Sequence, residues 1–263
     1  MLKIIIHGVR GSSPAIGQNF TKYGGNTTCI EVQTKSYRLI LDTGSGFKNI
    51  DFFKTKKQTA ILYTHFHHDH IQGLSNNPSL FNKRPPIKIC SAMLKEAELK
   101  KILSNYYSPK FFPITLFSEY KNLIFYNFDE IEREMLDEIA IEYTPLNHPG
   151  GACGYKIRTK NNSAVFLFDH EINDRDHLKL IEFCRDVDIV FWDGMFTNQE
   201  YKTKIGWGHS TIEQGYEFLQ SANVKDLYIC HHAPWRTDKE IDQLSALYPK
   251  NLIFAAEGAT IEL

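Results

Sequence analysis

Side chains that can bind metal are concentrated in one short segment of this sequence. The segment reads His-Phe-His-His-Asp-His from His65 to His70, and it follows an apolar run at residues 60–63 that is typical of a buried strand. Because alternate side chains of an extended segment point the same way, His65 and His67 can bind one ion. Asp69 and His70 lie on the turn beyond and can face a second ion. The spacing therefore predicts a two-metal site in a single loop.

Further residues of ligand type follow other predicted strands downstream. Asp169 comes directly after one apolar run, and His231 and His232 come directly after another. His148 ends a short segment at a Pro-Gly-Gly turn, where a side chain can project into a cleft. If His231, which immediately follows its strand, is the ligand, then His232 points to the opposite side.

This pattern resembles the His-x-His-x-Asp-His signature of the metallo-β-lactamase superfamily. The resemblance extends to an early Asp-Thr-Gly turn at Asp42, whose carboxylate is expected to support a ligand histidine or the metal-binding loop. It implies two divalent metal ions, zinc preferred and manganese or iron possible, since histidine and carboxylate ligands suit all three. The implied ligands are His65, His67, His148 and Asp169 for the first ion, and Asp69, His70, His231 and the shared Asp169 for the second.

Composition is consistent with one catalytic domain over residues 1–263. The chain is 42% hydrophobic, enough for a large core, and no linker, repeat or low-complexity segment divides it. The net charge of −1 gives no basic field for an extended nucleic acid. The amino-terminal apolar run is too short for a signal peptide, and the five cysteines are scattered, so we expect a cytoplasmic protein without membrane spans or a disulfide framework.

The elements that must position these ligands are predicted from hydrophobic periodicity. Strand patterns occupy both halves of the chain, and amphipathic patterns predict helices at 93–105, 174–184 and 211–222. The resemblance implies an α/β fold, an αββα sandwich in which two mixed sheets stack face to face, with helices outside and metals at one edge.

A His-Ser-Thr segment beginning at His209 indicates the chemistry. It precedes a predicted helix and resembles the phosphodiesterase branch of the superfamily, which contains tRNase Z and cyclic phosphodiesterases. Asp193 stands where that branch often has the Glu of His-Glu-Ala-Thr, with Trp192 in place of the His. A carboxylate beside an imidazole fixes its tautomer and favours its protonated form, so Asp193 and His209 could form a general-acid dyad. Alternatively, His209 only caps the helix and Asp193 only ends a strand.

Four further residues are candidates for substrate contacts. Arg10 could bind a phosphate oxygen, and the Gly-Gly-Asn turn ending at Asn26 could offer donors to an anion. Ser210 and Thr211 follow His209 and could contact substrate or cap the helix. The amino-terminal segment around Arg10 and Asn26 resembles bacterial cyclic-nucleotide and phosphoribosyl cyclic phosphodiesterases, although Gly-rich turns also serve only as connections.

These observations predict a metal-dependent phosphodiesterase acting on a small cyclic diester, such as a cyclic nucleotide or a ribosyl cyclic phosphate. Asp69 could orient the nucleophile while His209 protonates the leaving oxygen. The aromatic stretch 106–117 could stack on a base, form a dimer surface or pack in the core. A homodimer is implied by resemblance only. A tRNase Z-like endonuclease, a lactonase or thioesterase, and a non-catalytic metal-binding protein remain alternatives.

Overall fold

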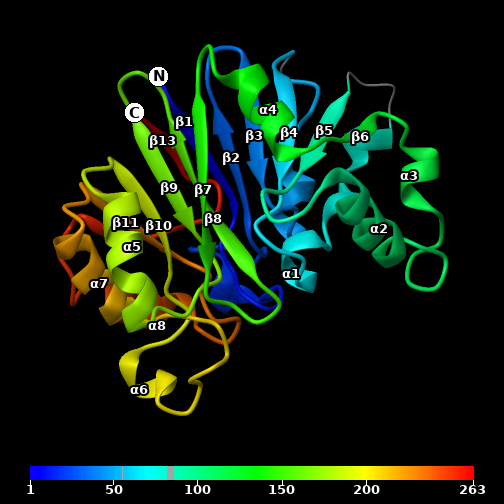
Figure 1. The fold of residues 1–263 in the computed structure, drawn as a ribbon. Coiled ribbons are helices and arrows are strands. Elements are labelled where there is room, and N and C mark those ends of the chain that lie inside the picture. Colours follow the sequence, from blue (N-terminus) through cyan, green and yellow to red (C-terminus); the bar gives the residue numbers. More distant parts are fainter. Residues whose placement is uncertain (55, 82–85) are drawn as a thin grey trace.

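Two mixed β-sheets face each other in the computed structural model of this protein, which describes residues 1–54, 56–81 and 86–263 (Figure 1). In the first sheet, the strands from β13 to β3 pair antiparallel and those from β3 to β6 pair parallel. Its strands in spatial order are β13 (Thr260–Glu262), β1 (Lys3–Gly8), β2 (Cys29–Gln33), β3 (Tyr37–Leu41), β4 (Gln58–Leu62), β5 (Ile87–Cys90) and β6 (Leu123–Phe125).

The second sheet is also mixed. Its first four strands in spatial order pair parallel, and the last two add antiparallel hairpin partners. Its strands in spatial order are β12 (Leu252–Phe254), β11 (Asp226–Cys230), β10 (Ile189–Asp193), β9 (Ser163–Leu167), β8 (Ala152–Arg158) and β7 (Ala140–Leu146).

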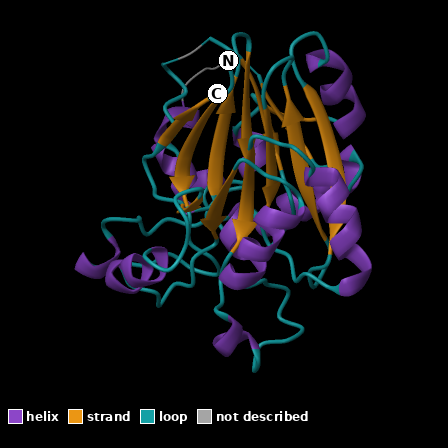
Figure 2. Ribbon diagram, turned by 90° about the vertical axis from the view of Figure 1, so that its left-hand side faces the viewer, coloured by secondary structure: helices purple, strands orange, loops and turns teal. Residues whose placement is uncertain are grey.

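Helices flank the sheet pair on both sides (Figure 2). Helices α2 and α3 lie beside the first sheet, α5, α7 and α8 lie beside the second, and α1 and α6 lie at one edge (Figure 1). The helices are α1 (His68–Ile71), α2 (Glu96–Tyr106), α3 (Leu116–Glu119), α4 (Phe128–Met135), α5 (Asp174–Cys184), α6 (Asn198–Tyr201), α7 (Ile212–Ser221) and α8 (Asp238–Ser245).

Three hydrophobic clusters hold these layers together. One lies between the sheets and joins Leu39 of β3 to Phe166 of β9. A second packs Phe218 of α7 against the outer face of the second sheet, and a third packs Leu103 of α2 against the outer face of the first. Burial of apolar surface on both faces of each sheet explains the near-continuous hydrophobic runs of β3, β9 and β10. The predicted αββα sandwich is confirmed.

The predicted helices are present with small shifts at their ends. The helix expected at 93–105 begins at Glu96, because Lys95 is extended and the Glu96 backbone N–H donates to the side chain of Asn127. Within the described residues, none of the helices is both long and apolar enough to cross a membrane.

Candidate metal centre

The predicted ligands converge where strands of both sheets end. In the first sheet, β4 leads into the segment that begins at His65; in the second, β9 leads into Asp169 and β11 into His231. The carboxyl ends of parallel strands are the usual location of ligand sites in α/β folds, because the loops there diverge from the sheet and leave room for a ligand. The two sheets therefore bring distant parts of the sequence to one edge.

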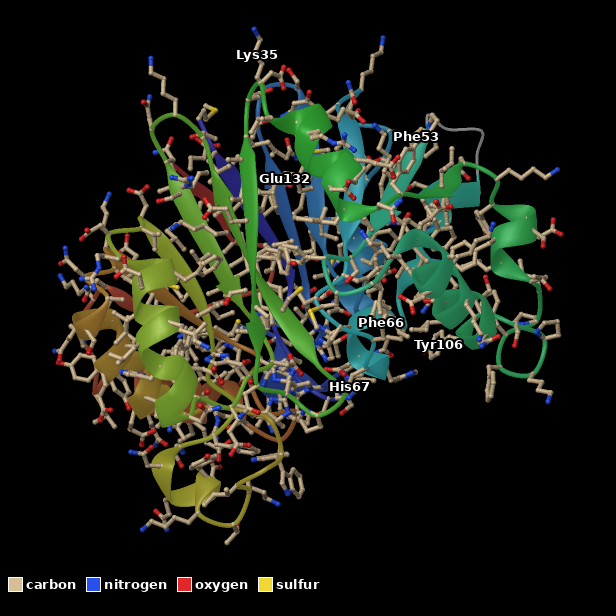
Figure 3. The ribbon with its side chains drawn as sticks, viewed as in Figure 1. Lys35, Phe53, Phe66, His67, Tyr106 and Glu132 are labelled. Carbon is tan, nitrogen blue, oxygen red and sulfur yellow. The ribbon has the colours of Figure 1, made fainter. Side chains whose placement is uncertain are left out.

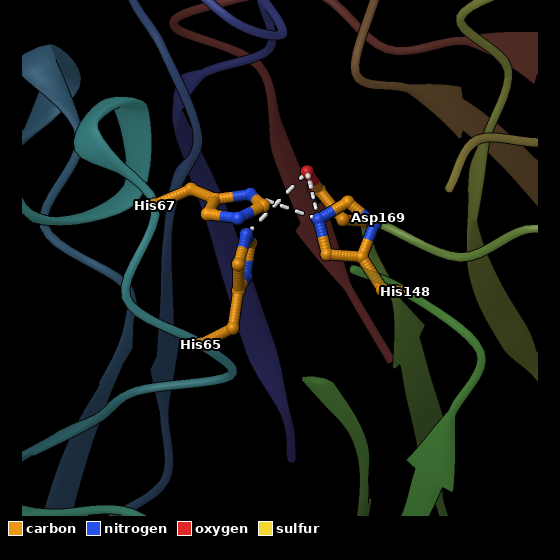
Figure 4. Close-up of side chains that lie close together, drawn as sticks. All are labelled: His65, His67, His148 and Asp169. Carbon is orange, nitrogen blue, oxygen red and sulfur yellow. Dashed lines mark hydrogen bonds and ion pairs between the residues drawn. The ribbon is translucent and has the colours of Figure 1, made fainter. Parts of the chain in front are cut away.

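A first group of candidate ligands comprises three histidines and one aspartate (Figure 4). One potential ligand atom from each of these side chains lies within 4.8 Å of all the others. The Nε2 atoms of His65 and His148 lie 3.5 and 3.7 Å from Oδ2 of Asp169. Nε2 of His148 also lies 2.9 Å from Nδ1 of His67. This group is His65, His67, His148 and Asp169.

A second group lies against the other oxygen of the same aspartate. Its Oδ1 atom is 2.9 Å from Nε2 of His70 and 3.1 Å from Nε2 of His231. Both ring nitrogens are 3.4 Å from Oδ2 of Asp69. Asp169 thus presents Oδ2 to the first group and Oδ1 to the second. This group is Asp69, His70, Asp169 and His231.

The chemistry of this cluster fits divalent cations. Nε2 of His65, Nε2 of His70 and Oδ1 of Asp169 are buried atoms that make no hydrogen bond. Buried polar atoms normally have hydrogen-bond partners, and buried charges are paired or bind metal. Burial lowers the pKa of His70, but the three surrounding carboxylates outweigh it and hold this pKa well above its usual value. Burial lowers the pKa of His65 well below its usual value, so the carboxylates favour positive charge beside His70 and not throughout the cluster.

Hydrogen bonds at the opposite ring nitrogens orient two of these histidines. Nδ1 of His70 lies 2.7 Å from Oδ2 of Asp42, whose carboxylate also accepts bonds from the backbone and side chain of Thr64. Nδ1 of His148 lies 2.8 Å from the carbonyl oxygen of Gly208. A proton on each Nδ1 leaves Nε2 with a free lone pair, which is the tautomer a metal ligand needs. Asp42 thus makes the supporting contacts expected from the sequence.

The predicted Asp193–His209 pair lies directly beside both groups. Oδ2 of Asp193 is 2.8 Å from Nδ1 of His209. Burial lowers the pKa of His209, but the charge and hydrogen bond of Asp193 outweigh this and raise it to about 9. The His209 ring centroid is 4.8 Å from that of His231 and 5.3 Å from that of His148. The imidazole whose protonated form Asp193 stabilises therefore faces one histidine of each group.

The structure corrects the role predicted for Arg10. Its side chain is fully buried, and its guanidinium donates to the carbonyl oxygens of Gly24 and Arg236, at 2.7 Å each. This guanidinium ties loops together. Its Nη2 atom has no hydrogen-bond partner among the described residues but is buried with the rest of the side chain, so it presents no exposed donor to a phosphate. Asn26 is likewise engaged, because its side-chain amide donates to Glu257 and accepts a hydrogen bond from Ser45.

Ser210 and Thr211 also differ from the prediction of substrate contact, since both are fully buried. The Ser210 hydroxyl donates to the carbonyl oxygen of His170 at 2.6 Å and accepts from the Ile172 backbone. Thr211 is the N-cap of α7, where its hydroxyl accepts from the backbone N–H of Gln214. These two residues hold the helix and the neighbouring loop, which was the alternative reading of their sequence positions.

Two aromatic positions near the cluster are also structural. His232 is buried and points away from the centre, with Nε2 2.9 Å from the carbonyl oxygen of Ala255. Trp192 is fully buried and donates its indole N–H to the carbonyl oxygen of Thr211. The packing therefore uses Trp192 to anchor the start of α7, one residue before Asp193.

The aromatic stretch 106–117 divides between core and surface. Tyr107 is buried in the core, whereas Phe111 is 77% exposed. The Tyr106 hydroxyl is 2.5 Å from Nδ1 of His68, the neighbour of His67, and Figure 3 shows Tyr106 and His67 at the same edge of the molecule. A pocket of about 430 Å³ opens here, lined by His68, Gln72, Ser75, Asn76, Tyr106, Tyr107, Phe111 and Phe112.

Glu171 was not predicted, although it touches loops on both sides of the cluster. Its carboxylate accepts hydrogen bonds from the Tyr201 hydroxyl and from the backbone N–H groups of Gly206 and Gly208. The only sequence signal for Glu171 was its place two positions after Asp169. Its hydrogen-bond partners are distant in sequence, so they could not be predicted from local patterns.

This chain is similar to known proteins in both sequence and structure. Residues 37–232 match the model of a family described as the beta-lactamase superfamily domain. A ribonuclease Z of Lachnospira eligens is 21% identical over 318 residues, an alignment that covers 100% of this chain and 98% of that protein.

Two of the solved structures that share this fold match it over 98% or more of their lengths. A diphosphatase of the PhnP family has a TM-score of 0.72 and 20% identity, with 100% of this chain and 98% of that chain covered. The metallo-beta-lactamase fold protein YhfI from Bacillus subtilis has a TM-score of 0.72 and 17% identity, with 100% of both chains covered. Because the sequence identities to these two structures are only 17% and 20%, the structural likeness shows a shared fold and not a shared activity.

Proposed function

Because this chain belongs to the beta-lactamase superfamily domain family and is a metal-dependent hydrolase, we propose that it hydrolyses a small cyclic phosphodiester, such as a cyclic nucleotide or a ribosyl cyclic phosphate, to a phosphomonoester. The observation that carries this proposal is the position of His209. It is held by Asp193 at 2.8 Å and faces both candidate ligand groups. A proton donor at this place serves a reaction in which an alkoxide leaves next to two cations.

The two ligand groups would hold two divalent ions, zinc preferred and manganese or iron compatible. When bound, such a pair supplies Lewis-acid activation of water and neutralises charge on a phosphoryl group. The residues of the chain supply orientation and proton transfer. Oδ2 of Asp69 accepts a hydrogen bond from the backbone N–H of Ser12 at 2.8 Å, which fixes a carboxylate that could orient the nucleophile.

His209 would act as the general acid. With Nδ1 engaged by Asp193, the proton for the leaving oxygen is on Nε2, and Asp193 stabilises the imidazolium before transfer. When a cyclic diester opens, the protonated leaving oxygen stays attached to the same molecule, so the product is a phosphomonoester. Among carbonyl substrates, a thioester expels a thiolate that needs little protonation and would give this dyad no evident role. A lactone also expels an alkoxide, so a substrate assay must separate it from a phosphodiester.

A pocket next to His68 has room for a substrate with a flat ring, and its lining residues belong to neither ligand group. It lies against His68, which follows His67 of the first group, and Phe111 is exposed at its wall. Its volume of about 430 Å³ is within the usual range for small-molecule sites. A nucleobase could stack there while the phosphodiester reaches the ligand groups.

Cleavage of precursor tRNA is a second candidate, because the ribonuclease Z relative aligns over the whole of this chain. The net charge of −1 argues against a polymer bound through its phosphates. The two candidates differ in substrate size, so one assay can compare them directly.

The test is a substrate panel for the zinc- or manganese-loaded protein. The panel contains bis-p-nitrophenyl phosphate, 2′,3′- and 3′,5′-cyclic nucleotides, a ribosyl 1,2-cyclic phosphate, a precursor tRNA, a lactone and a thioester. We expect turnover of a cyclic diester and none of tRNA, with Asp169→Ala as the inactive control. Turnover of tRNA alone would select the endonuclease, and turnover of only the lactone or thioester would refute the phosphodiesterase proposal.

A further inference from the structure

Glu171 joins two loops that carry functional side chains. Its buried carboxylate accepts from the Tyr201 hydroxyl at 2.7 Å, from the Gly206 backbone N–H at 2.9 Å, and from the Gly208 backbone N–H at 2.9 Å. The loop held in this way follows α6 and leads directly into His209. A charged acceptor makes stronger hydrogen bonds than a neutral one, so this carboxylate anchors the loop firmly.

The backbone of Glu171 is linked to the opposite loop. Its N–H donates to the carbonyl oxygen of Asn147 at 2.8 Å, and the Asn147 side-chain amide donates to the carbonyl oxygen of Glu171 at 2.9 Å. Asn147 immediately precedes His148 of the first ligand group. One residue, two positions after Asp169, is therefore bonded to segments next to both His148 and His209.

Gly208 links Glu171 to the first ligand group through its two backbone hydrogen bonds. Its N–H is held by Glu171, and its carbonyl oxygen accepts the hydrogen bond from Nδ1 of His148 at 2.8 Å. Its φ of +86° is in the left-handed region that favours glycine, and a Cβ atom there would lie 2.3 Å from Cδ of Pro149. The peptide on either side of Gly208 is thus held in one orientation, with its carbonyl aimed at His148.

We propose that Glu171 is a positioning residue for both sides of the reaction centre. Through Gly208 it fixes the ring orientation and the Nδ1–H tautomer of His148, and through the same loop it holds His209 beside the ligand groups. This inference rests on the proposed function for its kinetic readout, while its effect on metal affinity does not depend on the substrate.

Glu171→Gln is the informative variant because it keeps the size and removes the charge. The carboxylate uses both oxygens as acceptors, whereas a glutamine must turn an NH₂ group toward N–H or O–H donors. The loop should lose order while the core stays intact. Tyr201→Phe removes one donor to this carboxylate and provides a milder version of the same perturbation, should Glu171→Gln fold poorly. Glu182→Gln is the matched control, because Glu182 is exposed and pairs with Arg185.

The experiment has two readouts. Competition with a chromophoric chelator should show zinc bound about 10–100-fold more weakly by Glu171→Gln, the usual effect of losing an outer partner of a ligand. At saturating metal, kcat for a diester with a poor leaving group should fall about 10-fold or more, and kcat for an aryl diester should fall much less. Because Glu171 acts through His209, adding Glu171→Gln to His209→Ala should slow the poor-leaving-group reaction little further.

Each remaining result has a defined meaning. If His209→Ala alone slows both diesters equally, the general-acid part of the proposed function fails, and the metal-affinity readout alone decides the role of Glu171. Suppose instead that His209→Ala slows only the diester with the poor leaving group. If Glu171→Gln and Tyr201→Phe then match the Glu182→Gln control in both metal affinity and leaving-group dependence, Glu171 has only a structural role. Full additivity of the two substitutions at saturating metal would overturn the claim that Glu171 positions His209.

Discussion

Oδ2 of Asp42 lies 2.7 Å from Nδ1 of His70, and both side chains are fully buried. The same carboxylate accepts two hydrogen bonds from Thr64, so its position is set by the end of β4 and not by the metal site itself. His70 is thereby turned so that Nε2 faces Asp69 and Asp169. A residue outside both ligand groups thus determines how one ligand is presented.

Asp42→Asn should weaken metal binding at the second group about 10–100-fold, because the amide cannot accept the same set of hydrogen bonds and no longer favours a proton on Nδ1 of His70. Chelator competition measures the affinity. Asp129→Asn is the control, since Asp129 is an exposed partner of Arg133 on α4. Wild-type affinity for Asp42→Asn would show that the hydrogen bond does not orient the ligand.

Asp169→Ala should lose both metal ions, because Oδ1 and Oδ2 face different ligand groups. His67→Ala should affect the first group only, since His67 has contacts there and belongs to that group alone. Metal-to-protein ratios after dialysis, measured by mass spectrometry, distinguish the two variants. Both should lack measurable turnover, and an equal loss of metal in both would argue against Asp169 as a bridge.

His209→Ala should retain both metal ions but slow hydrolysis of a diester with a poor leaving group by about 10²–10⁴-fold. An activated aryl diester needs little help from a proton donor and should lose much less. Asp193→Asn should show the same selectivity to a smaller degree, because the imidazole remains but its partner is no longer charged. The measurement is the hydrolysis rate of each variant on the two diesters. Equal losses of rate on both diesters would show that His209 is not the general acid.

Phe111→Ala should raise KM for a cyclic nucleotide by an amount corresponding to about 1–3 kcal/mol, the usual contribution of an aromatic ring stacked on a base. The ring is 77% exposed at the pocket wall, so its removal should leave the fold unchanged. A ribosyl cyclic phosphate without a base should be unaffected. Leu178→Ala, which shortens an exposed side chain on α5, is the control. Unchanged KM for the nucleotide would exclude this pocket as a base site.

The ligand positions could be predicted from the sequence because each follows a recognisable strand. The apolar run before His65 and the runs before Asp169 and His231 are local features, and strand ends at one edge of a sheet are a general consequence of parallel pairing. The spacing in the segment from His65 to His70 added the division into two groups. The structure places these side chains in the groups that were expected.

Long-range packing decided the remaining roles. The segment around Arg10 has the residue types of an anion site, yet its side chain is enclosed by backbone carbonyls supplied from residues near 24 and 236. Glu171 is the opposite case, a residue without a recognisable motif that makes contacts near the ligand groups. Its contacts depend on a loop near residue 206 whose position cannot be predicted from hydrophobic periodicity. Local sequence determines which side chains stand at the ends of strands, since that depends on alternation and turns. Only the tertiary structure decides which polar groups are buried against one another, because this depends on how separate loops meet.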